Sequence, residues 1–292
     1  MTIFDRAALR RHRLRAMPGF ADHDFLFREV AARLVERLGE VRRHFPLALD
    51  LGCRGGIMAE ALGDSDGVET LIGCDLAAGL LPATGPRLVA DEEMLPFADG
   101  GLDLIVSPLA LHWVNDLPGT LVQARRALRP DGLFLAALLG GDTLVELRSA
   151  LATAEVATEG GMAPRVSPMI DAADAGALLQ RAGFALPMVD VDTITARYRS
   201  PLALMRELRG MGESNALAAR RKGFARQATL AAAVADYERR FGGDDERVPA
   251  TFQILYLTGW APHAAQPRPL DPGSARARLA DALGASEPPA RD

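Results

Sequence analysis

Apolar and polar positions follow two different patterns along this chain. Residues 25–45 place apolar side chains at steps of three and four, which predicts a helix with one buried face that ends at Pro46. Beyond Pro46, short apolar runs alternate with helical stretches, a pattern typical of a parallel sheet covered by helices on both faces. The chain is therefore predicted to be an α/β protein.

The apolar runs predict a set of strands, most of them followed by a helix. Strands are expected at Leu47–Leu51, Thr70–Asp75, Arg87–Ala90, Leu102–Ser107, Leu133–Leu139, Val189–Tyr198 and Ala250–Thr258. Helices are expected at Ile57–Leu62, Pro118–Leu128, Asp142–Thr158, Asp171–Ala182, Pro201–Met211 and Ala216–Phe241. The segment Arg129–Gly132 contains a proline and a glycine, and it is expected to form the turn before the fifth strand.

Composition and charge narrow the range of functions. The formal net charge of the 292 residues is −5, which argues against general binding along nucleic acid. The longest uncharged apolar run, Leu133–Leu139, is far shorter than the roughly 20 residues of a membrane-spanning helix. The two cysteines, Cys53 and Cys74, are too few for a disulfide framework and fit a reducing compartment.

The amino-terminal segment is rich in arginine, with five arginines between residues 6 and 15. Such a start can be a mitochondrial transit peptide, but this one lacks serine and the helical pattern resumes at Phe25. We expect a helix that lies over the domain, with a basic face near an acidic substrate or a membrane surface.

The stretch from Leu47 to Gly56 is a buried strand that runs into a glycine-rich turn and then a helix. Glycines in such a turn let the backbone approach a ligand, and free N–H groups at the helix start favour anionic groups. The dinucleotide-binding fingerprint is absent because Arg54 and Ile57 stand where it needs glycine. A phosphate-binding P-loop is absent too, because no Gly-Lys-Ser/Thr follows.

Three acidic residues, Asp50, Asp75 and Asp91, lie at or near the carboxyl ends of successive predicted strands. Ligands of open α/β sheets bind at this edge, and an acid about 20 residues after the first glycine can accept hydrogen bonds from both ribose hydroxyls. Asp75 fits that position, and Asp91 fits an acceptor for an adenine amino group. Each acid alone could be a helix or turn cap, so the interpretation depends on all three occurring together.

These residues resemble those of the class I S-adenosylmethionine-dependent methyltransferases. The run Asp50-Leu51-Gly52-Cys53 is similar to their first motif, and Asp91–Phe97 (DEEMLPF) is similar to the adenine loop of the biotin-pathway and quinone-pathway branches. The resemblance implies a Rossmann-like, seven-stranded sheet with helices on both faces and an antiparallel last strand. It also implies S-adenosylmethionine as the cofactor, bound by Asp50, Gly52, Cys53, Gly55, Gly56, Asp75, Leu76, Asp91, Glu92 and Ser107.

A narrower resemblance, to the mitochondrial complex I assembly factor five family and its bacterial relatives, extends over nearly the whole chain. It rests on the segments LHWVNDLP (111–118), GGDTL (140–144), ELR (146–148), GMGESN (210–215) and VPATFQ (248–253). Mitochondrial members of that family are described as hydroxylating an arginine of a peripheral-arm complex I subunit. The resemblance implies a protein substrate and a substrate cleft containing Trp113, Arg148, Glu213 and Asn215. Glu213 would pair with the target guanidinium there, or form a salt bridge on a helix surface.

The chain departs from the family pattern in the glycine-rich turn. Related motifs place glycine where Arg54 stands and a variable residue after it, whereas here Arg54 precedes Gly55. If that position requires a left-handed φ, a residue other than glycine costs about 1–2 kcal/mol. Gly55 can take the turn instead, with Arg54 meeting the carboxylate of the cofactor.

Candidate catalytic residues follow the fourth and fifth predicted strands. His112 is a candidate base for methyl transfer, or a histidine hydrogen-bonded beneath Trp113, which itself forms a substrate wall or plain core. Asp142 is a second candidate, or a simple helix cap. Hydroxylation usually calls on a metal or a flavin, but the histidines form no His-x-Asp/Glu pair typical of an iron site, so no metal ligand is predicted.

These segments predict the domain boundaries and a function. We expect a helical cover at 1–45, a methyltransferase domain at 46–262 and a Pro-rich, disordered tail at 263–292. Within the domain, 46–140 is the cofactor core and 141–262 the substrate side. The leading hypothesis is a cytoplasmic enzyme that binds S-adenosylmethionine and modifies a complex I subunit; a eukaryotic source would place it in the mitochondrial matrix. The rivals are an O-methyltransferase for a small molecule or an acyl-carrier thioester, and a non-catalytic assembly chaperone.

Overall fold

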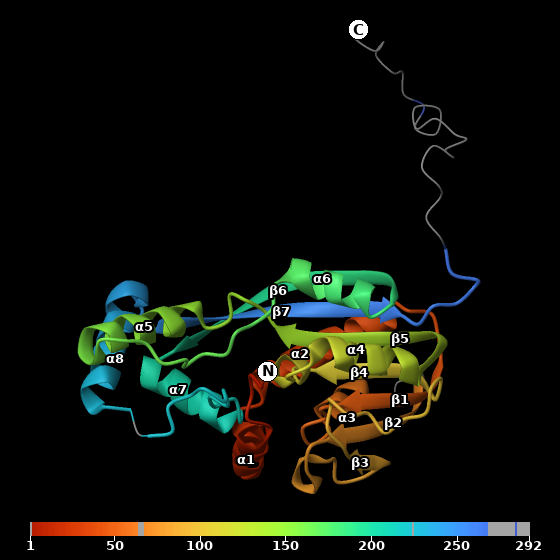
Figure 1. The fold of residues 1–292 in the computed structure, drawn as a ribbon, viewed down its shortest axis with the longest axis horizontal. Helices are drawn as coiled ribbons and strands as arrows, with labels where there is room; N and C mark the ends of the chain where they lie inside the picture. The colour runs from red at the N-terminus through yellow and green to blue at the C-terminus, as the bar shows by residue number, and fades with distance from the viewer. Residues whose placement is uncertain (1, 64–66, 224, 268–283, 285–292) are drawn as a thin grey trace. The chain divides into compact units, whose positions relative to one another are not determined.

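The computed structural model of the protein describes residues 2–63, 67–223, 225–267 and 284 (Figure 1). By their contacts the residues divide into two units, Met1–Pro262 and His263–Asp292. The predicted disordered tail, apart from residues 263–267 and 284, lies outside the described residues. The fold and the candidate site belong to the first unit.

A seven-stranded mixed sheet, in the order β3-β2-β1-β4-β5-β7-β6, forms the centre of the first unit. Its strands are β1 (Phe45–Leu51), β2 (Val68–Asp75), β3 (Arg87–Val89), β4 (Leu102–Pro108), β5 (Leu128–Leu139), β6 (Ala185–Tyr198) and β7 (Val248–Trp260). Strands β1 to β5 pair in parallel, whereas β7 runs antiparallel to both β5 and β6. The predicted Rossmann-like sheet with an antiparallel last strand is confirmed.

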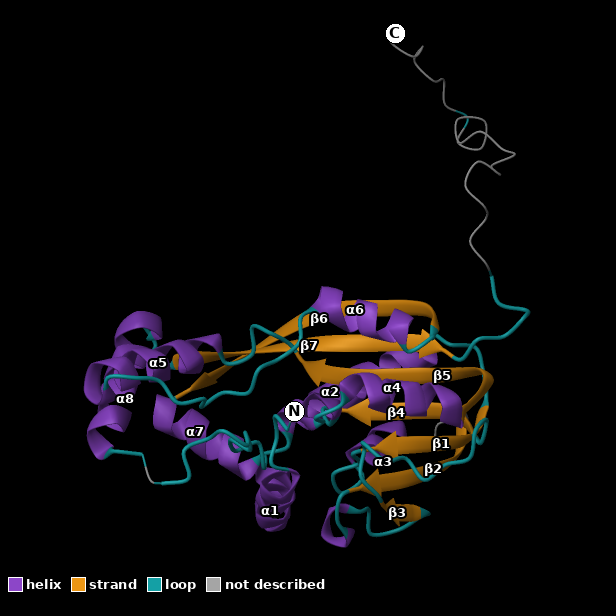
Figure 2. Ribbon diagram, in the orientation of Figure 1, coloured by secondary structure: helices purple, strands orange, loops and turns teal. Residues whose placement is uncertain are grey.

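Helices cover both faces of this sheet (Figure 2). They are α1 (Arg6–Ala16), α2 (Phe25–Gly39), α3 (Ile57–Leu62), α4 (Leu117–Ala127), α5 (Val145–Glu159), α6 (Ala172–Arg181), α7 (Pro201–Gly210) and α8 (Gln227–Phe241), with 3-10 turns η1 (Met17–Asp22), η2 (Ala78–Leu80) and η3 (Leu111–Trp113). Helices α2 and α3 pack together on one face, and α4 and α6 on the other. Strands β6 and β7 extend past the parallel strands toward α5 and α8 (Figure 1).

The apolar patterns explain why these elements form. Strand β1 is buried on both sides, with Ala48 in the core beneath α2 and Leu49 in the core beneath α4. Helix α2 turns one apolar face inward, including Leu26, Phe27 and Val30, as the spacing predicts. Among the described residues, every helix is too short or too polar to cross a bilayer.

Three predicted elements differ from the structure. The helix expected at 25–45 ends at Gly39, because Phe45 already pairs as the first residue of β1. The helix expected from Ala216 begins only at Gln227. The turn expected at Arg129–Gly132 is part of β5, where the pairing with β4 jumps from Leu128 to Leu133, so the extra residues form an irregularity within the strand.

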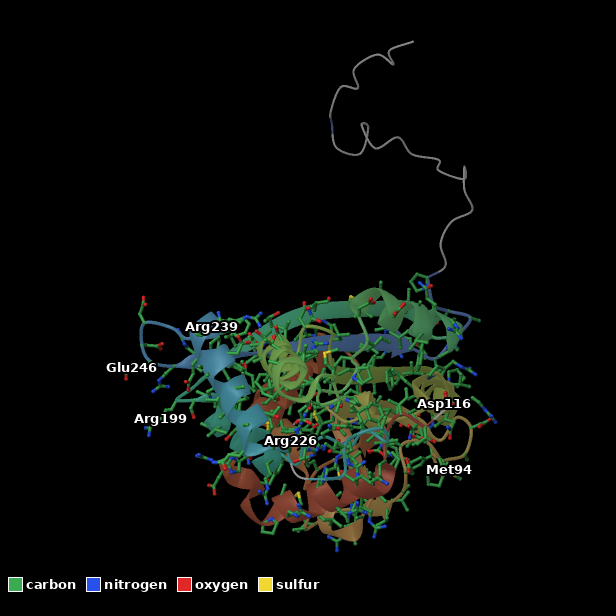
Figure 3. All side chains as sticks on the ribbon, turned by 60° about the vertical axis from the view of Figure 1, so that its left-hand side comes forward. Met94, Asp116, Arg199, Arg226, Arg239 and Glu246 are labelled. Carbon is green, nitrogen blue, oxygen red and sulfur yellow. The ribbon has the colours of Figure 1, made fainter. Side chains whose placement is uncertain are left out.

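Charged side chains gather on the outside of the molecule around α8. Arg199, Arg226, Arg239 and Glu246 are all exposed there (Figure 3). None of these four described residues lines the cavity of about 500 Å³ that opens among α2, α5 and α7. They are solvated surface groups, and the candidate chemistry lies elsewhere.

Candidate functional site

The carboxyl ends of the parallel strands meet at one edge of the sheet, which is where ligands of open α/β folds bind. The glycine-rich loop 52–56 follows β1 at this edge, Asp75 ends β2, and Ser107 lies near the end of β4. Helix α1 lies beside these strand ends and contacts α7 (Figure 1). The candidate site therefore lies between the sheet edge and α1.

The glycine-rich loop consists of backbone that most residues rarely adopt. Gly52, Gly55 and Gly56 have φ values of 80°, 82° and 99°. A Cβ atom on Gly52 would lie 2.2 Å from Cβ of Ala110, so this loop packs directly against the segment after β4. The side chain of Cys53 is buried beside the carbonyl of Leu80, and burial raises the pKa of its thiol. These residues fix the course of the loop.

Arg54 takes the left-handed conformation that related motifs give to glycine. Its φ is 40°, so Gly55 does not take the turn in its place, and that expectation is wrong because both residues have positive φ. The backbone N–H of Arg54 donates to Oδ2 of Asp75 at 3.0 Å. The side chain of Arg54 is buried, and its guanidinium pairs with the carboxylate of Glu213.

Two fully buried carboxylates, those of Asp75 and Glu92, face the guanidinium of Arg13 on α1. Nη1 of Arg13 lies 3.3 Å from Oε1 of Glu92 and 3.7 Å from Oδ1 of Asp75. Oδ1 of Asp75 also accepts a hydrogen bond from the N–H of Leu76 at 2.7 Å. Burial raises the pKa of Asp75, and Arg13 opposes that rise. One buried cation of α1 therefore compensates two buried acids of the sheet edge.

A second arginine of α1 binds the same acidic loop. Nη2 of Arg6 donates to Oδ1 of Asp91 at 2.7 Å and to a carboxylate oxygen of Glu92. The loop is fixed from within as well, because Oδ1 of Asp91 accepts from the N–H of Glu93 at 2.9 Å. Helix α1, which we expected as a basic cover, thus lies on the acids that the resemblance assigns to the cofactor.

Two other predicted cofactor residues point into the protein. Both carboxylate oxygens of Asp50 are buried, without a hydrogen-bond partner among the described residues. Burial, and then repulsion from Asp75, raises the pKa of Asp50 well above its ordinary value. Oγ of Ser107 donates to the carbonyl of Leu51 at 2.7 Å and is fully buried. Ser107 is therefore not placed for direct contact with a ligand, whereas Asp50 borders a small pocket beside Gly55 and Gly56.

The acceptors at this edge fit the donors of an adenosyl group. Ribose hydroxyls and the adenine amino group donate hydrogen bonds, and Asp75, Asp91 and Glu92 offer carboxylate oxygens at the expected strand ends. In this structure the guanidinium groups of Arg6 and Arg13 already bind these oxygens. The donor and acceptor chemistry therefore fits the cofactor, and the guanidinium groups of Arg6 and Arg13 would have to release these oxygens for an adenosyl group to bind them.

A cavity of about 500 Å³ opens beside this edge, and its wall is mostly apolar. It lies among α2, α5, α7 and the ends of β4, β5 and β7. Of the predicted site residues, the structure brings His112, Trp113, Glu213 and Asn215 together in its wall. Four arginines also line it: Arg165, Arg209, Arg220 and Arg221. Its size is that of a small-molecule or side-chain pocket.

Glu213 is the centre of a buried polar cluster in that wall. Its Oε1 lies 2.8 Å from Nη1 of Arg54, while its Oε2 accepts from Nε1 of Trp113 and lies 3.4 Å from Nε2 of His112. Burial alone would raise the pKa of Glu213, but Arg54, and then His112 and Arg13, hold it below its ordinary value. Glu213 is therefore ionised at neutral pH.

His112 is neutral in this cluster. Burial lowers the pKa of His112, although Glu213 opposes the fall. If Nε2–H points to Glu213, Nδ1 remains as an acceptor, and Nδ1 is buried with no hydrogen-bond partner among the described residues. The ring also lies 5.7 Å from that of Trp113, so His112 is held beneath the indole and beside the carboxylate at once.

Two predicted site residues lie away from the cavity. Asp142 is exposed, and its Oδ2 accepts from Nε2 of Gln253 at 2.9 Å. Arg148 donates to the carbonyl of Gly141 at 2.6 Å and lines a separate, smaller pocket. Neither side chain lines the cavity among the described residues, because each is turned toward neighbouring backbone or β7. The structure therefore does not place Asp142 beside His112.

Some residues of the site were not predicted from sequence. Arg13 looked like a solvated residue of a basic helix, and Phe27 looked like ordinary core on the apolar face of α2. Their spacing alone gave no sign that tertiary packing brings Arg13 to Asp75 and Phe27 to Arg54. Among the described residues, no group of three or more His, Cys, Asp or Glu side chains is arranged to hold a metal ion.

Comparisons with known proteins agree with this geometry. Residues 49–136 match the family model of a methyltransferase domain. The protein "Arginine-hydroxylase NDUFAF5, mitochondrial" of Danio rerio is 43% identical over 289 residues, covering 96% of this chain and 89% of the relative. The malonyl-[acyl-carrier protein] O-methyltransferase of Laribacter hongkongensis is 37% identical over 265 residues, covering 85% of this chain and 86% of the relative. A phosphoethanolamine N-methyltransferase structure from Haemonchus contortus matches with a TM-score of 0.52 at 15% identity, covering 85% of this chain and 58% of that one.

Fold and sequence together define a protein of the S-adenosylmethionine-dependent methyltransferase class. Within that class, the chain belongs to the family of the arginine hydroxylase NDUFAF5. The shared sequence extends well beyond the methyltransferase domain at 49–136, since it covers 96% of the chain. The resemblance found in the sequence motifs is confirmed.

Proposed function

We propose that this protein binds S-adenosylmethionine at the sheet edge and modifies an arginine side chain of a protein during assembly of respiratory complex I. The observation that carries the proposal is the ionised carboxylate of Glu213 in the wall of an otherwise apolar and basic cavity. An arginine has an apolar stem and a guanidinium that pairs with a carboxylate, so it matches such a cavity. The relatives that are 43% identical carry the name arginine hydroxylase, which supports the same substrate.

The cofactor would be held by the acids that α1 now covers. Asp75 would accept from the ribose hydroxyls and Asp91 from the adenine amino group, once Arg13 and Arg6 have withdrawn from these carboxylates. S-adenosylmethionine, when bound, supplies an adenosyl sulfonium with an activated methyl group. Gly52 keeps the loop backbone close to the strand ends, and the buried surroundings of Asp75 exclude water.

His112 is the residue that we propose for proton transfer. It is neutral, and its Nδ1 has no hydrogen-bond partner among the described residues. It would take up the proton that a guanidinium nitrogen loses if the reaction is methyl transfer, whereas hydroxylation of a C–H bond needs no such base. Trp113 holds Glu213 in place through its indole N–H. We do not propose a catalytic role for Asp142, because it is exposed and bound to Gln253. The chain's own contribution is thus to orient the guanidinium, to keep water out and to hold a proton acceptor nearby.

We propose hydroxylation as the reaction, in line with the name of the relatives. Hydroxylation puts one oxygen atom of dioxygen into a C–H bond, while two electrons from an external reductant and two protons convert the other oxygen atom to water. Methyl transfer instead adds a methyl group. The two products therefore differ in mass. In a bacterium, the peripheral arm of complex I faces the cytoplasm, which is where we propose that the protein acts.

A second candidate is methyl transfer to the free carboxyl group of an acyl-carrier thioester. It is favoured by the relative that is 37% identical and by the apolar cavity with four arginines in its wall, of which Arg165, Arg220 and Arg221 already pair with carboxylates of the chain. An acyl chain would fill the leucine-lined part of the cavity, with its carboxylate on one of these arginines. Under this alternative, Glu213 would repel the substrate, which is why we rank it second.

Mass spectrometry of complex I subunits distinguishes these possibilities. We would compare cells with the gene, cells without it, and cells that carry Glu213→Gln. An oxygen on a subunit arginine that requires both the gene and Glu213 is the expected result. A methyl group on the same arginine would change the reaction but keep the substrate. Unmodified subunits together with methylation of a malonyl thioester by the purified protein would establish the alternative, and the absence of both would overturn the proposal.

A further inference from the structure

We propose that the Oε1 side of Glu213, the ring of Phe27 and the carbonyl of Met211 form a binding site for one guanidinium group. In this structure the protein's own Arg54 occupies it, and the target arginine takes it when Arg54 withdraws. We call these three groups the guanidinium site. The inference rests on the proposed function, since it names the place where an arginine substrate would bind.

Arg54 meets three different kinds of partner at the guanidinium site. Its Nη1 donates to the carbonyl oxygen of Met211 at 2.7 Å and lies 2.8 Å from Oε1 of Glu213. Its guanidinium carbon lies 4.5 Å from the ring centroid of Phe27. A carboxylate, a carbonyl and an aromatic face are the partners that a planar guanidinium uses, and an ammonium group matches them less well.

The carboxylate of Glu213 is arranged so that one oxygen stays available for a guanidinium. Trp113 and His112 both approach Oε2, which leaves Oε1 to Arg54. Because the indole N–H of Trp113 fixes the carboxylate, the guanidinium site would keep its shape after Arg54 left. This division of the two oxygens is what a preorganised binding site requires.

The same three groups can be reached from the large cavity. Phe27, Met211 and Glu213 all line the cavity of about 500 Å³, whereas Arg54 is not among its lining residues. Arg54 instead reaches the guanidinium site from the glycine-rich loop. A side chain that entered through the cavity would therefore meet the groups that Arg54 now holds.

Several features of Arg54 oppose its present position. Its φ of 40° lies in the left-handed region, which is unfavourable for a residue with a Cβ atom. Its Nη2 is buried without a hydrogen-bond partner among the described residues. Burial, and then repulsion from the nearby buried cation of Arg13, lowers the pKa of Arg54. These costs reduce the free energy needed for a substrate guanidinium to displace Arg54.

Chemical complementation tests the guanidinium site directly. We would purify the full chain as Arg54→Gly, together with the double variant Arg54→Gly/Glu213→Gln. Thermal unfolding would be followed with millimolar guanidinium chloride and with equal sodium chloride, far below denaturing concentrations. We expect the thermal unfolding midpoint of Arg54→Gly to be higher in guanidinium chloride than in sodium chloride at the same concentration. We expect no rise in the wild type, where Arg54 fills the guanidinium site, or in the double variant, which lacks the carboxylate.

Calorimetry with N-acetyl-arginine amide provides the second measurement. Arg54→Gly should bind it at least about tenfold more tightly than the wild type or the double variant does. If Arg54→Gly does not fold, Arg54→Met, which keeps the apolar stem, replaces it in both measurements. Equal responses of the single and double variants would overturn the inference.

The outcomes separate this inference from the proposed function. Guanidinium binding that depends on Glu213, in a protein that leaves every complex I arginine unmodified, would keep the site and reject the function. Modified arginine together with no guanidinium binding would keep the function and reject the site.

Discussion

The guanidinium of Arg13 lies 3.7 Å from the carboxylate of Asp75, and both side chains are completely buried. Two of the three guanidinium nitrogens of Arg13, Nε and Nη2, have no hydrogen-bond partner among the described residues. The guanidinium of Arg13 has five N–H donors but is held mainly through Nη1. Its charge compensates that of Asp75, while most of its N–H groups make no hydrogen bond within the described chain. Such an occupant can be displaced by a ligand that satisfies the carboxylates better.

Arg13→Met should therefore tighten the binding of S-adenosylmethionine while it weakens the free protein. Without the cation, Asp75 and Glu92 remain buried and uncompensated, so we expect a loss of about 3 kcal/mol in the free energy of unfolding. The cofactor no longer competes with a guanidinium, so its affinity should rise about tenfold or more in calorimetry. Arg10→Met, an exposed position on the same helix, is the matched control. Unchanged affinity in Arg13→Met would show that α1 does not compete with the cofactor.

Asp75→Asn should weaken binding of S-adenosylmethionine, because it removes the charge and replaces one of the two oxygens that accept from the N–H groups of Arg54 and Leu76 with a donor. Each hydrogen bond to a charged acceptor contributes about 1.5–3 kcal/mol, so losing the charge is expected to lower the affinity at least about tenfold. Asp99→Asn is the control, because the side chain of Asp99 is 68% exposed and pairs only with Arg126 on the surface of the described chain. Equal affinities of the wild type and Asp75→Asn would remove Asp75 from the cofactor site.

The parallel part of the fold could be predicted because its signals are local. Strand β1 is a continuous apolar run, and α3 begins and ends at the residues that the pattern indicates. The start of strand β5 was harder to predict, since Pro130 and Gly132 have the composition of a turn and Asp131 between them has a φ of 65°, yet the segment lies within the strand. Local composition cannot show that β5 pairs with β4 on one side and with β7 on the other, and that this pairing keeps the irregular segment within the sheet.

The contents of the site could be predicted only in part. Acids at strand ends are visible in the sequence, and Asp75 and Glu92 do lie together at the sheet edge. The partners of those acids depend on tertiary packing. Arg13 comes from a helix more than sixty residues before Asp75. Arg54 reaches the carbonyl of Met211, 157 positions further along the chain, and the carboxylate of Glu213 two residues beyond Met211. No spacing rule connects such residues.

Acid should destabilise the protein through His112. Burial lowers the pKa of His112 in the folded state, so between that value and the ordinary value of about 6.5 the unfolded state binds more protons. Stability should therefore be complete above about pH 6.5 and should fall as the pH drops below it, by roughly 1 kcal/mol for each unit of pKa difference. Glu213 adds to the loss at lower pH, because Arg54 holds its pKa below the ordinary value against burial.

The measurement is the unfolding midpoint of wild type and His112→Gln at a series of pH values between neutral and mildly acidic. The unfolding midpoint should change less with pH in His112→Gln than in the wild type. The change that remains is expected from His12, because burial lowers its pKa as well. Parallel curves for wild type and His112→Gln would mean that His112 does not carry the effect.

Gly52→Ala should destabilise the fold itself, because the loop at Gly52 has neither the backbone conformation nor the space for a methyl group. Its φ is 80°, and the added Cβ would lie 2.2 Å from Cβ of Ala110. The left-handed conformation costs about 1–2 kcal/mol and the overlap about 1–3 kcal/mol, so denaturant unfolding should show a loss of about 2–5 kcal/mol. Gly141→Ala is the matched control, since a Cβ there meets nothing within 4 Å, and its effect should stay within about 0.5 kcal/mol. If Gly52→Ala were as stable as Gly141→Ala, the segment that carries Ala110 would have to yield easily, and the close packing of the glycine-rich loop could not be what fixes the sheet edge around Asp75.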